Sequence, residues 1–298
     1  MVVQVDFTRS ARVTEQIAVC YLCRPGRLGC TQHDLPRPVS NLGSGLSFPG
    51  ISNRGVRRLS QTHLRFISHV GANKPENIVN RHVECPFCDR SQLTDILDED
   101  GPILLIMNKY PVLEDAYQTV LVETDDCEGE LSQYPKAHLY RLMRFGLKHW
   151  ARLRESGDFA SVLFFKNHGP YSGGTQRHPH MQIVGLKDVD YHDMLDTSYT
   201  DGLTVATRGG ATLNVSTQPR VGFFEFNVLF NNPDEDLEPM ADFIQAATHY
   251  TLNHFHHLCR SYNLFFYTLP GDPAAYKSRT AFCYISHLHR IFDSTGIR

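Results

Sequence analysis

Hydrophobic and polar residues follow a regular order between residues 102 and 186. Two apolar runs, Pro102–Met107 and Gln118–Val122, predict β-strands, the first of them wholly buried. Apolar residues then recur at helical spacing over residues 134–155, which predicts a long amphipathic helix. Two more runs, Ala160–Lys166 and His180–Leu186, predict further strands. The expected order is therefore strand, strand, helix, strand, strand.

The same order recurs in the second half of the chain. Val221–Phe226 and Val228–Asn231 have strand-like patterns, and apolar residues from Met240 to Leu258 predict a second amphipathic helix. Leu264–Leu269 and Ala281–Ile285 then correspond to the last two strands of the first half. The recurrence indicates an internal duplication of about 120 residues, inferred from pattern rather than from residue identity.

The composition is that of an ordinary globular protein. The chain has 298 residues, of which 41% are hydrophobic and 20% charged, with a formal net charge of −3. This balance gives no support to a nucleic-acid binder, which is normally basic. No apolar run is long enough for a membrane helix, and the first residues lack a secretory signal. Eight cysteines in a chain of this length predict a reducing, cytoplasmic location rather than a disulfide scaffold.

Residues 1–60 differ from the rest of the chain. They contain eight arginines, no lysine and three acidic residues. We expect a poorly ordered extension, although an organelle transit peptide also fits this composition. Cys20, Cys23 and Cys30 are a weaker metal-site candidate, because only His33 could join them. Residues 61–195 and 196–298 are then expected to form the two repeats.

The segment from Gly173 to Gln182 carries the most distinctive chemistry. Strand alternation places His178, His180 and Gln182 on one face. The preceding run, Phe164–Gly169, predicts a buried strand that enters a glycine-rich loop. Backbone N–H groups of such a loop suit a phosphate held beside a nucleophilic imidazole. A structural histidine pair is the alternative, but the glycine loop and Gln182 favour the chemical interpretation.

The second half offers no equivalent of this motif. Phe282-Cys283-Tyr284 falls where His-Pro-His is expected, and His287 and His289 follow without a glutamine or a glycine loop. We therefore expect a degenerate repeat that has no nucleophile and no second metal, and that closes the pocket of the first.

The His178-Pro179-His180-Met181-Gln182 motif and its glycine loop resemble the galactose-1-phosphate uridylyltransferase branch of the histidine-triad superfamily. More narrowly, residues 64–186 resemble a bacterial group of uridylyltransferase-like proteins of uncharacterised function. The resemblance implies that His180 attacks an α-phosphorus to form a nucleotidyl-histidine, and that Gln182 hydrogen-bonds the phosphoryl oxygens. Hydrolases of the superfamily carry histidine at the Gln182 position, so the glutamine favours transfer over hydrolysis.

A metal site is predicted around Cys85-Pro86-Phe87-Cys88. This spacing is typical of a zinc site, and a redox pair would instead need a helix opening at the first cysteine within a βαβ unit. The resemblance implies that a structural zinc takes two ligands from this pair, one from the end of a strand and one from the first histidine of the motif. The proposed ligands of one structural Zn²⁺ per chain are Cys85, Cys88, Cys127 and His178, with cysteine where the family has histidine. Cys127 could alternatively be an unliganded thiol.

The resemblance also implies a set of nucleotide contacts. Asn108 matches a family asparagine that contacts the ribose, although turn chemistry explains it equally well. Asn167 lies at the mouth of the glycine loop, Gly174 lies within it, and Thr175 replaces a serine that contacts the phosphate. Arg177 either pairs with phosphate or faces solvent.

Together these features predict an α+β protein of two tandem histidine-triad-like repeats, each an antiparallel sheet crossed by a long helix. The expected activity is exchange of a nucleotidyl group between a nucleotide-sugar and a sugar phosphate. Alternatives are a dinucleoside polyphosphate phosphorylase or hydrolase, and a nucleotide-binding module without turnover. We expect no nucleic-acid or membrane partner, and a homodimer is left open.

Overall fold

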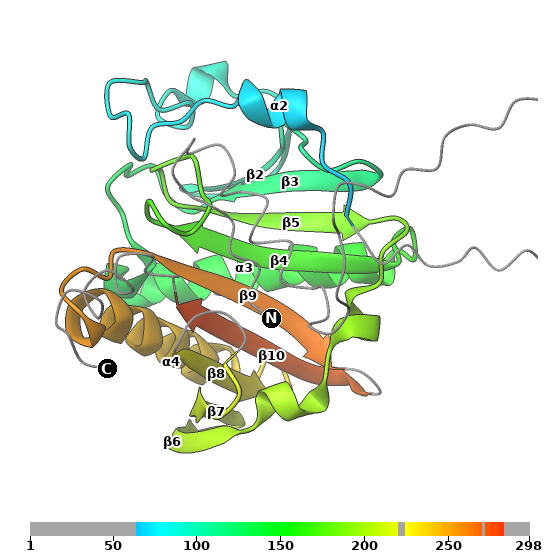
Figure 1. Cartoon of the computed structure of the whole chain (residues 1–298), viewed down its shortest axis with the longest axis vertical. Helices are drawn as coiled ribbons and strands as arrows, with labels where there is room; N and C mark the ends of the chain where they lie inside the picture. The colour runs from blue at the N-terminus through cyan, green and yellow to red at the C-terminus, as the bar shows by residue number, and fades with distance from the viewer. Residues whose placement is uncertain (1–63, 220–223, 270–271, 283–298) are drawn as a thin grey trace, which may run out of the picture.

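A single antiparallel sheet organises the molecule. The computed structural model describes residues 64–219, 224–269 and 272–282. In this part of the chain the ten strands have the order β1-β2-β3-β5-β4-β9-β10-β8-β7-β6 (Figure 1). The strands are β1 Ile96–Asp100, β2 Ile103–Met107, β3 Ala116–Val122, β4 Ser161–His168, β5 His180–Leu186, β6 Gly202–Arg208, β7 Ala211–Ser216, β8 Glu225–Phe230, β9 Tyr262–Leu269 and β10 Asp272–Phe282.

The strand order shows a duplication. Read from one edge the sheet runs β1-β2-β3-β5-β4, and read from the other edge it runs β6-β7-β8-β10-β9, which is the same order. The halves meet where β4 and β9 pair antiparallel, with Phe165 opposite Phe265. The two predicted sheets are thus one continuous sheet. The expected boundary at residue 195 lies between β5 and β6 and stays a prediction.

Two helices cover one face of the sheet. Helix α3, Lys136–Glu155, and helix α4, Leu237–Tyr250, pack their apolar faces on one core, with α3 behind β4 in Figure 1. Trp150 is fully buried in this core, and its indole N–H donates to the Val162 carbonyl over 2.9 Å. Gly146 lets α3 approach the sheet closely, because a Cβ there would lie 2.6 Å from the Phe164 ring. The short helix α2, Ser68–Ala72, lies near β2 and β3.

Two expectations for the second half need correction. The last strand was expected at Ala281–Ile285, but β10 already begins at Asp272 and pairs with β9 up to Phe282 opposite Tyr262. Phe282 therefore pairs with the first residue of β9, as Leu186 pairs with the first residue of β4, and does not take the place of His180. The predicted second helix ends at Tyr250 and continues as a π-helical turn, Thr251–Phe255.

Other expectations fall partly outside the described residues. These are the extension at residues 1–60 with its cysteines, and His287 and His289. Val221–Phe226 and Val228–Asn231 were expected as two strand-like runs, but the described part forms one strand, β8. Within the described residues, no helix is both long and apolar enough to cross a membrane.

Candidate active site and metal centre

The motif histidines lie on the sheet face that the helices leave uncovered. Met181 and Ile183 belong to the helix-side core, so strand alternation turns His180 and Gln182 to the other face. Val184, two residues further on, belongs to a separate apolar cluster on that second face. The predicted grouping of His180 with Gln182 is therefore present in the structure.

The His180 ring is held in one tautomer. Its Nδ1 lies 2.9 Å from the His178 carbonyl oxygen, which can only accept a hydrogen bond, so a neutral ring carries its proton on Nδ1. The Nε2 lone pair is then available for attack on an electrophile. Burial lowers the pKa of His180 to about 3, with the nearby Lys166 and Lys74 charges adding to the shift, so the imidazole is neutral at physiological pH.

The loop between β4 and β5 depends on glycine. Gly169 has φ +85°, and a Cβ there would lie 2.1 Å from the Arg260 carbonyl oxygen. Gly173 has φ +90°. Both backbone conformations are ones that other residues adopt only under strain. Gly174 packs on Asn167, its virtual Cβ 3.2 Å from the Asn167 carbonyl oxygen, so these two predicted residues lie together.

The second repeat anchors this loop through residues that the sequence did not single out. The Asn263 side-chain amide on β9 donates to Asn167 Oδ1 over 2.6 Å and to the Ser172 carbonyl over 2.8 Å. The Ser261 hydroxyl accepts from the Tyr171 amide over 3.0 Å. Neither residue belongs to a motif, and only the predicted duplication could have placed β9 beside the loop.

A segment before the cysteine pair lines the other side of the loop. The backbone N–H of Asn77 donates to the Thr175 carbonyl over 3.0 Å. The side-chain Oδ1 of Asn77 accepts from the backbone N–H of Arg177 over 2.7 Å. Asn77 is almost fully buried, at 2% exposure. Asn77 is thus a third site residue that the sequence pattern did not reveal.

Two other predicted residues have protein partners. Asn108 Oδ1 accepts from the Tyr110 amide over 2.9 Å, which is the turn chemistry considered above. The backbone N–H of Asn108 also donates to the Gln118 carbonyl over 2.9 Å. Gln118 lies on β3 opposite Val184, which is four residues past His180 on β5. The Arg177 guanidinium pairs with Glu128 over 2.8 Å and lies 3.7 Å from Cys127 Sγ.

The four predicted metal ligands converge. One donor atom from each of Cys85, Cys88, Cys127 and His178 lies within 4.8 Å of the others. Zinc–sulfur bonds of about 2.3 Å set tetrahedron edges of about 3.8 Å, so the cluster needs little contraction to hold the ion. The His178 Nε2 lies 2.8 Å from the Thr124 carbonyl oxygen and must donate there, which leaves Nδ1 free, 3.4 Å from Cys85 Sγ. This Cys₃His group could hold a metal such as zinc.

A residue between the two cysteines also lies beside His180. Phe87, between the two cysteines, packs its ring 5.7 Å from that of His178 and 5.9 Å from that of His180, between centroids. The same ring rests on the apolar cluster of β2 and β3. A metal bound to Cys85 and Cys88 would therefore also hold the Phe87 ring in place beside His180.

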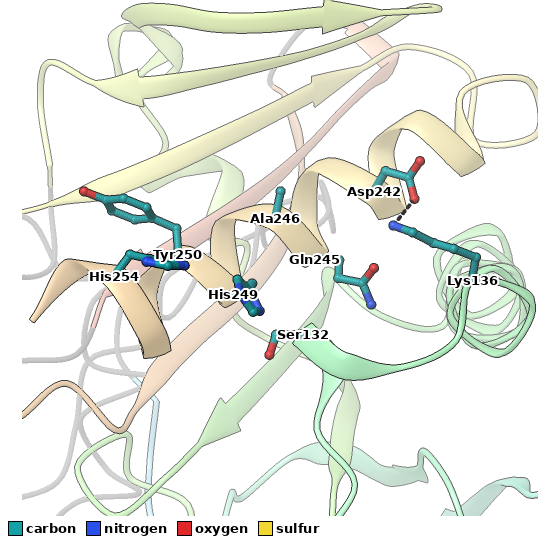
Figure 2. A pocket seen from close by; sticks show the side chains of 8 residues that line it. All are labelled: Ser132, Lys136, Asp242, Gln245, Ala246, His249, Tyr250 and His254. Carbon is teal, nitrogen blue, oxygen red and sulfur yellow. Dashed lines mark hydrogen bonds and ion pairs between the residues drawn. The ribbon is translucent and has the colours of Figure 1, made fainter. Parts of the chain in front are cut away.

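A separate cleft of about 360 Å³ lies on the helix side of the sheet (Figure 2). Its walls come from α4 and from the segment that enters α3, and Lys136 pairs with Asp242 across it over 2.5 Å. His249 and His254 lie along its α4 side (Figure 2). Because His180 faces the opposite side of the sheet, this cleft is distinct from the histidine site.

His168, the last residue of β4, gives a test of the electrostatics. Its ring stacks on Tyr262 at 4.9 Å between centroids, and burial, aided by the Lys166 charge, lowers its pKa to about 4. The unfolded chain, with a pKa near 6.5, takes up a proton below that pH and the folded chain does not. The contribution to stability is therefore present above about pH 6.5 and is lost as pH falls towards 4.

We expect His168→Phe to weaken this pH dependence. The free energy of unfolding decreases from pH 7 to pH 4.5, and this decrease should be about 1–2 kcal/mol smaller in the variant than in the wild type. The range is reduced because the His168 ring is partly exposed to solvent. Urea denaturation at the two pH values measures the difference, with the exposed His82→Phe as the control. Equal pH dependence in the wild type and His168→Phe would refute the assignment.

Comparison with known proteins agrees with this architecture. The antiparallel sheet with helices on one face is a fold that this chain shares with a solved uridylyltransferase structure. The chain belongs to the DUF4931 family: the N-terminal domain of this domain of unknown function matches residues 66–189, and the C-terminal domain matches residues 192–278. No curated protein matches the sequence.

Solved structures give the same result. A DUF4931 family protein from Bacillus cereus is 38% identical, with a TM-score of 0.63 over 68% of this chain and 93% of its own. A uridylyltransferase is 17% identical, with a TM-score of 0.54 over 67% of this chain and 79% of its own. An ADP-glucose phosphorylase from Arabidopsis thaliana, with bound ADP-glucose, is 14% identical, with a TM-score of 0.53 over 71% and 83%. At these identities the last two show the shared fold alone.

Proposed function

We propose that the protein is a nucleotidyltransferase in which His180 carries the nucleotidyl group. A nucleotide-sugar binds with its α-phosphate at the glycine loop. His180 Nε2 forms a bond to the α-phosphorus, and the bond to the leaving sugar 1-phosphate oxygen breaks. A second sugar 1-phosphate, or another phosphate, then takes the nucleotidyl group from His180.

The His178 carbonyl contact carries this proposal, because it leaves the Nε2 of a neutral imidazole as the nucleophile. Gln182 supports it as well. This side chain is partly exposed on the same face, and no protein partner occupies it within the described residues. An amide N–H there is free to donate to a phosphoryl oxygen. Asn167, Gly174 and Thr175 would contact the phosphate, and Asn108 would contact the ribose.

The proposed donor class draws on the structural relatives. One is named a uridylyltransferase, and another binds ADP-glucose. Both names refer to nucleotide chemistry, and the second to a nucleotide-sugar. The zinc proposed at Cys85, Cys88, Cys127 and His178 has four protein ligands, which leaves no open position, so its role would be structural.

A nucleotide-binding module without turnover is the second candidate. The observation that favours it is the burial of His180, whose exposure is 7%. A panel of α-labelled nucleotide-sugars and dinucleoside polyphosphates separates the candidates. A transferase acquires covalent label from a nucleotide-sugar, whereas a phosphorylase acquires it from a dinucleoside polyphosphate. A binding module retains the nucleotide without a covalent bond, and this result would overturn the proposal.

Gln182→His should change how the intermediate partitions. The substitution restores the third histidine of the hydrolase pattern, so the fraction of label released to water should rise about tenfold relative to that passed to a phosphate acceptor. Product analysis with and without acceptor measures this ratio, and the exposed Gln92→His is the control. An unchanged ratio would leave His180 as nucleophile but remove the reason for expecting transfer.

A further inference from the structure

A buried ion pair lies directly behind the nucleophile strand. Lys166 on β4 and Glu123, just after β3, are 1% and 0% exposed, and their ammonium and carboxylate groups are in contact. The Tyr134 hydroxyl donates to the other Glu123 oxygen over 3.0 Å. Strand alternation places Lys166 on the helix side with Phe164, so the pair and the His180 ring are on opposite faces of the sheet.

Stability alone does not explain this pair. Removing two charges from water costs several kcal/mol per ion, and well-packed apolar residues often replace a buried pair at no loss of stability. The pair belongs to a buried polar group on the helix side of the sheet, in which the Tyr262 hydroxyl donates to Glu130 over 2.7 Å. The contacts of the pair point instead to the histidine motif.

Each carbonyl of the His-Pro-His motif has its own partner. The His178 carbonyl accepts from the His180 ring over 2.9 Å, and the Pro179 carbonyl accepts from the Glu123 amide over 3.1 Å. The His180 carbonyl lies 3.4 Å from Lys166 Nζ. The paired register of β4 and β5 extends only to Phe165 opposite Gln182, so His180 lies beyond it. The ammonium contacts the backbone where the two strands part to form the glycine loop.

We infer that Lys166 and Glu123 are positioning residues that hold the backbone of the nucleophile strand at His180. This inference rests on the proposed function. Lys166 fixes the His180 carbonyl, while Glu123 fixes Lys166 through the ion pair and Pro179 through its amide. Neither residue reaches the substrate face. A displacement of a reacting group by about 1 Å can cost on the order of 100-fold in rate. A buried ion pair that keeps the backbone of His180 in place would therefore increase the rate of nucleotidyl transfer.

The test is a neutral double variant, Glu123→Gln/Lys166→Met, in the full-length protein with zinc bound. We expect its covalent labelling rate by the best donor of the panel to fall at least about tenfold, while the dissociation constant of that donor stays within about twofold. The unfolding temperature and the zinc content should stay close to wild type. Lys136→Met, which removes a lysine from the Asp242 ion pair on the same side of the sheet, should label at the wild-type rate.

A second variant covers the case in which the double variant does not fold. Lys166→Arg keeps a positive charge beside Glu123, but the guanidinium group is planar and larger than the lysine ammonium group. It cannot occupy the same place at the His180 carbonyl. Labelling should again slow with the fold intact. Wild-type labelling rates in the folded variants would overturn the positioning role and leave the proposed function standing. A wild type that is never labelled would overturn both.

Discussion

His180→Ala should abolish covalent labelling by any nucleotide donor. The substitution removes the imidazole whose Nδ1 is bound by the His178 carbonyl and whose Nε2 is left as nucleophile. No other residue on this face of β5 offers an unliganded imidazole, since Gln182, Val184 and Leu186 follow. Loss of a catalytic nucleophile commonly costs several orders of magnitude in rate, so we expect at least about a 1000-fold decrease.

Matched variants separate this effect from loss of structure. His82→Ala removes an exposed histidine before the cysteine pair and should label like the wild type. His178→Ala should lower zinc content and stability first, with weaker labelling as a consequence. Acid-labile, base-stable label on His180→Ala protein would show that another residue is the nucleophile, because a phosphoramidate has that stability.

Cys88→Ser should release the metal and destabilise the protein by several kcal/mol. Cys88 is exposed, so the change disturbs little packing, and the loss reports mainly on the metal. Free energy of metal binding at a structural site is also free energy of folding. Metal analysis should find about one zinc per chain in the wild type and a marked loss in the variant, together with a lower unfolding temperature.

Cys259→Ala is the control for the zinc assignment. Cys259 is buried, outside the cluster, and its thiol lies 3.7 Å from the Ser261 carbonyl oxygen. This variant should keep its zinc even if packing loss lowers its stability. Wild-type protein that contains no zinc when purified without chelator, or equal zinc content in Cys88→Ser, would contradict the assignment of the four ligands.

The first half of the fold was predictable because its pattern is strong. The strand at His180–Leu186 was expected with the observed bounds, and the helix at residues 134–155 begins two residues later, at Lys136. Long apolar periods of this kind leave few alternatives. The group of Cys85, Cys88, Cys127 and His178 was predictable for a different reason: the Cys-x-x-Cys spacing and the motif resemblance named these residues, and the structure places them together.

The last strand was harder to predict. Residues 272–282 contain Asp272, Pro273, Lys277 and Arg279, and the sequence Gly271-Asp272-Pro273 at the start of this strand is typical of a turn. Pairing with β9 on one side and β8 on the other forms this strand despite its polar sequence. The edge strands β1 and β6 were not predicted for a similar reason. β1 contains three acidic residues, and most of β6 is exposed.

The supporting residues of the site could not be found from local pattern. Asn263 lies 91 residues from Ser172 in the loop that it anchors, and Glu123 lies 43 residues from Lys166. Each reads locally as an ordinary strand or loop residue. Their roles depend on which strands are neighbours in the completed sheet, and short-range periodicity does not contain that information.

Mass spectrometry of the trapped intermediate can identify the residue that carries the nucleotidyl group. The full-length, zinc-containing protein is incubated with each α-labelled nucleotide donor, quenched in base to preserve a phosphoramidate, and digested. We predict one nucleotidyl adduct, located by fragmentation on His180, which disappears when a phosphate acceptor is added before the quench. An adduct on another residue, or nucleotide that binds without any covalent adduct, would show that His180 is not the nucleophile.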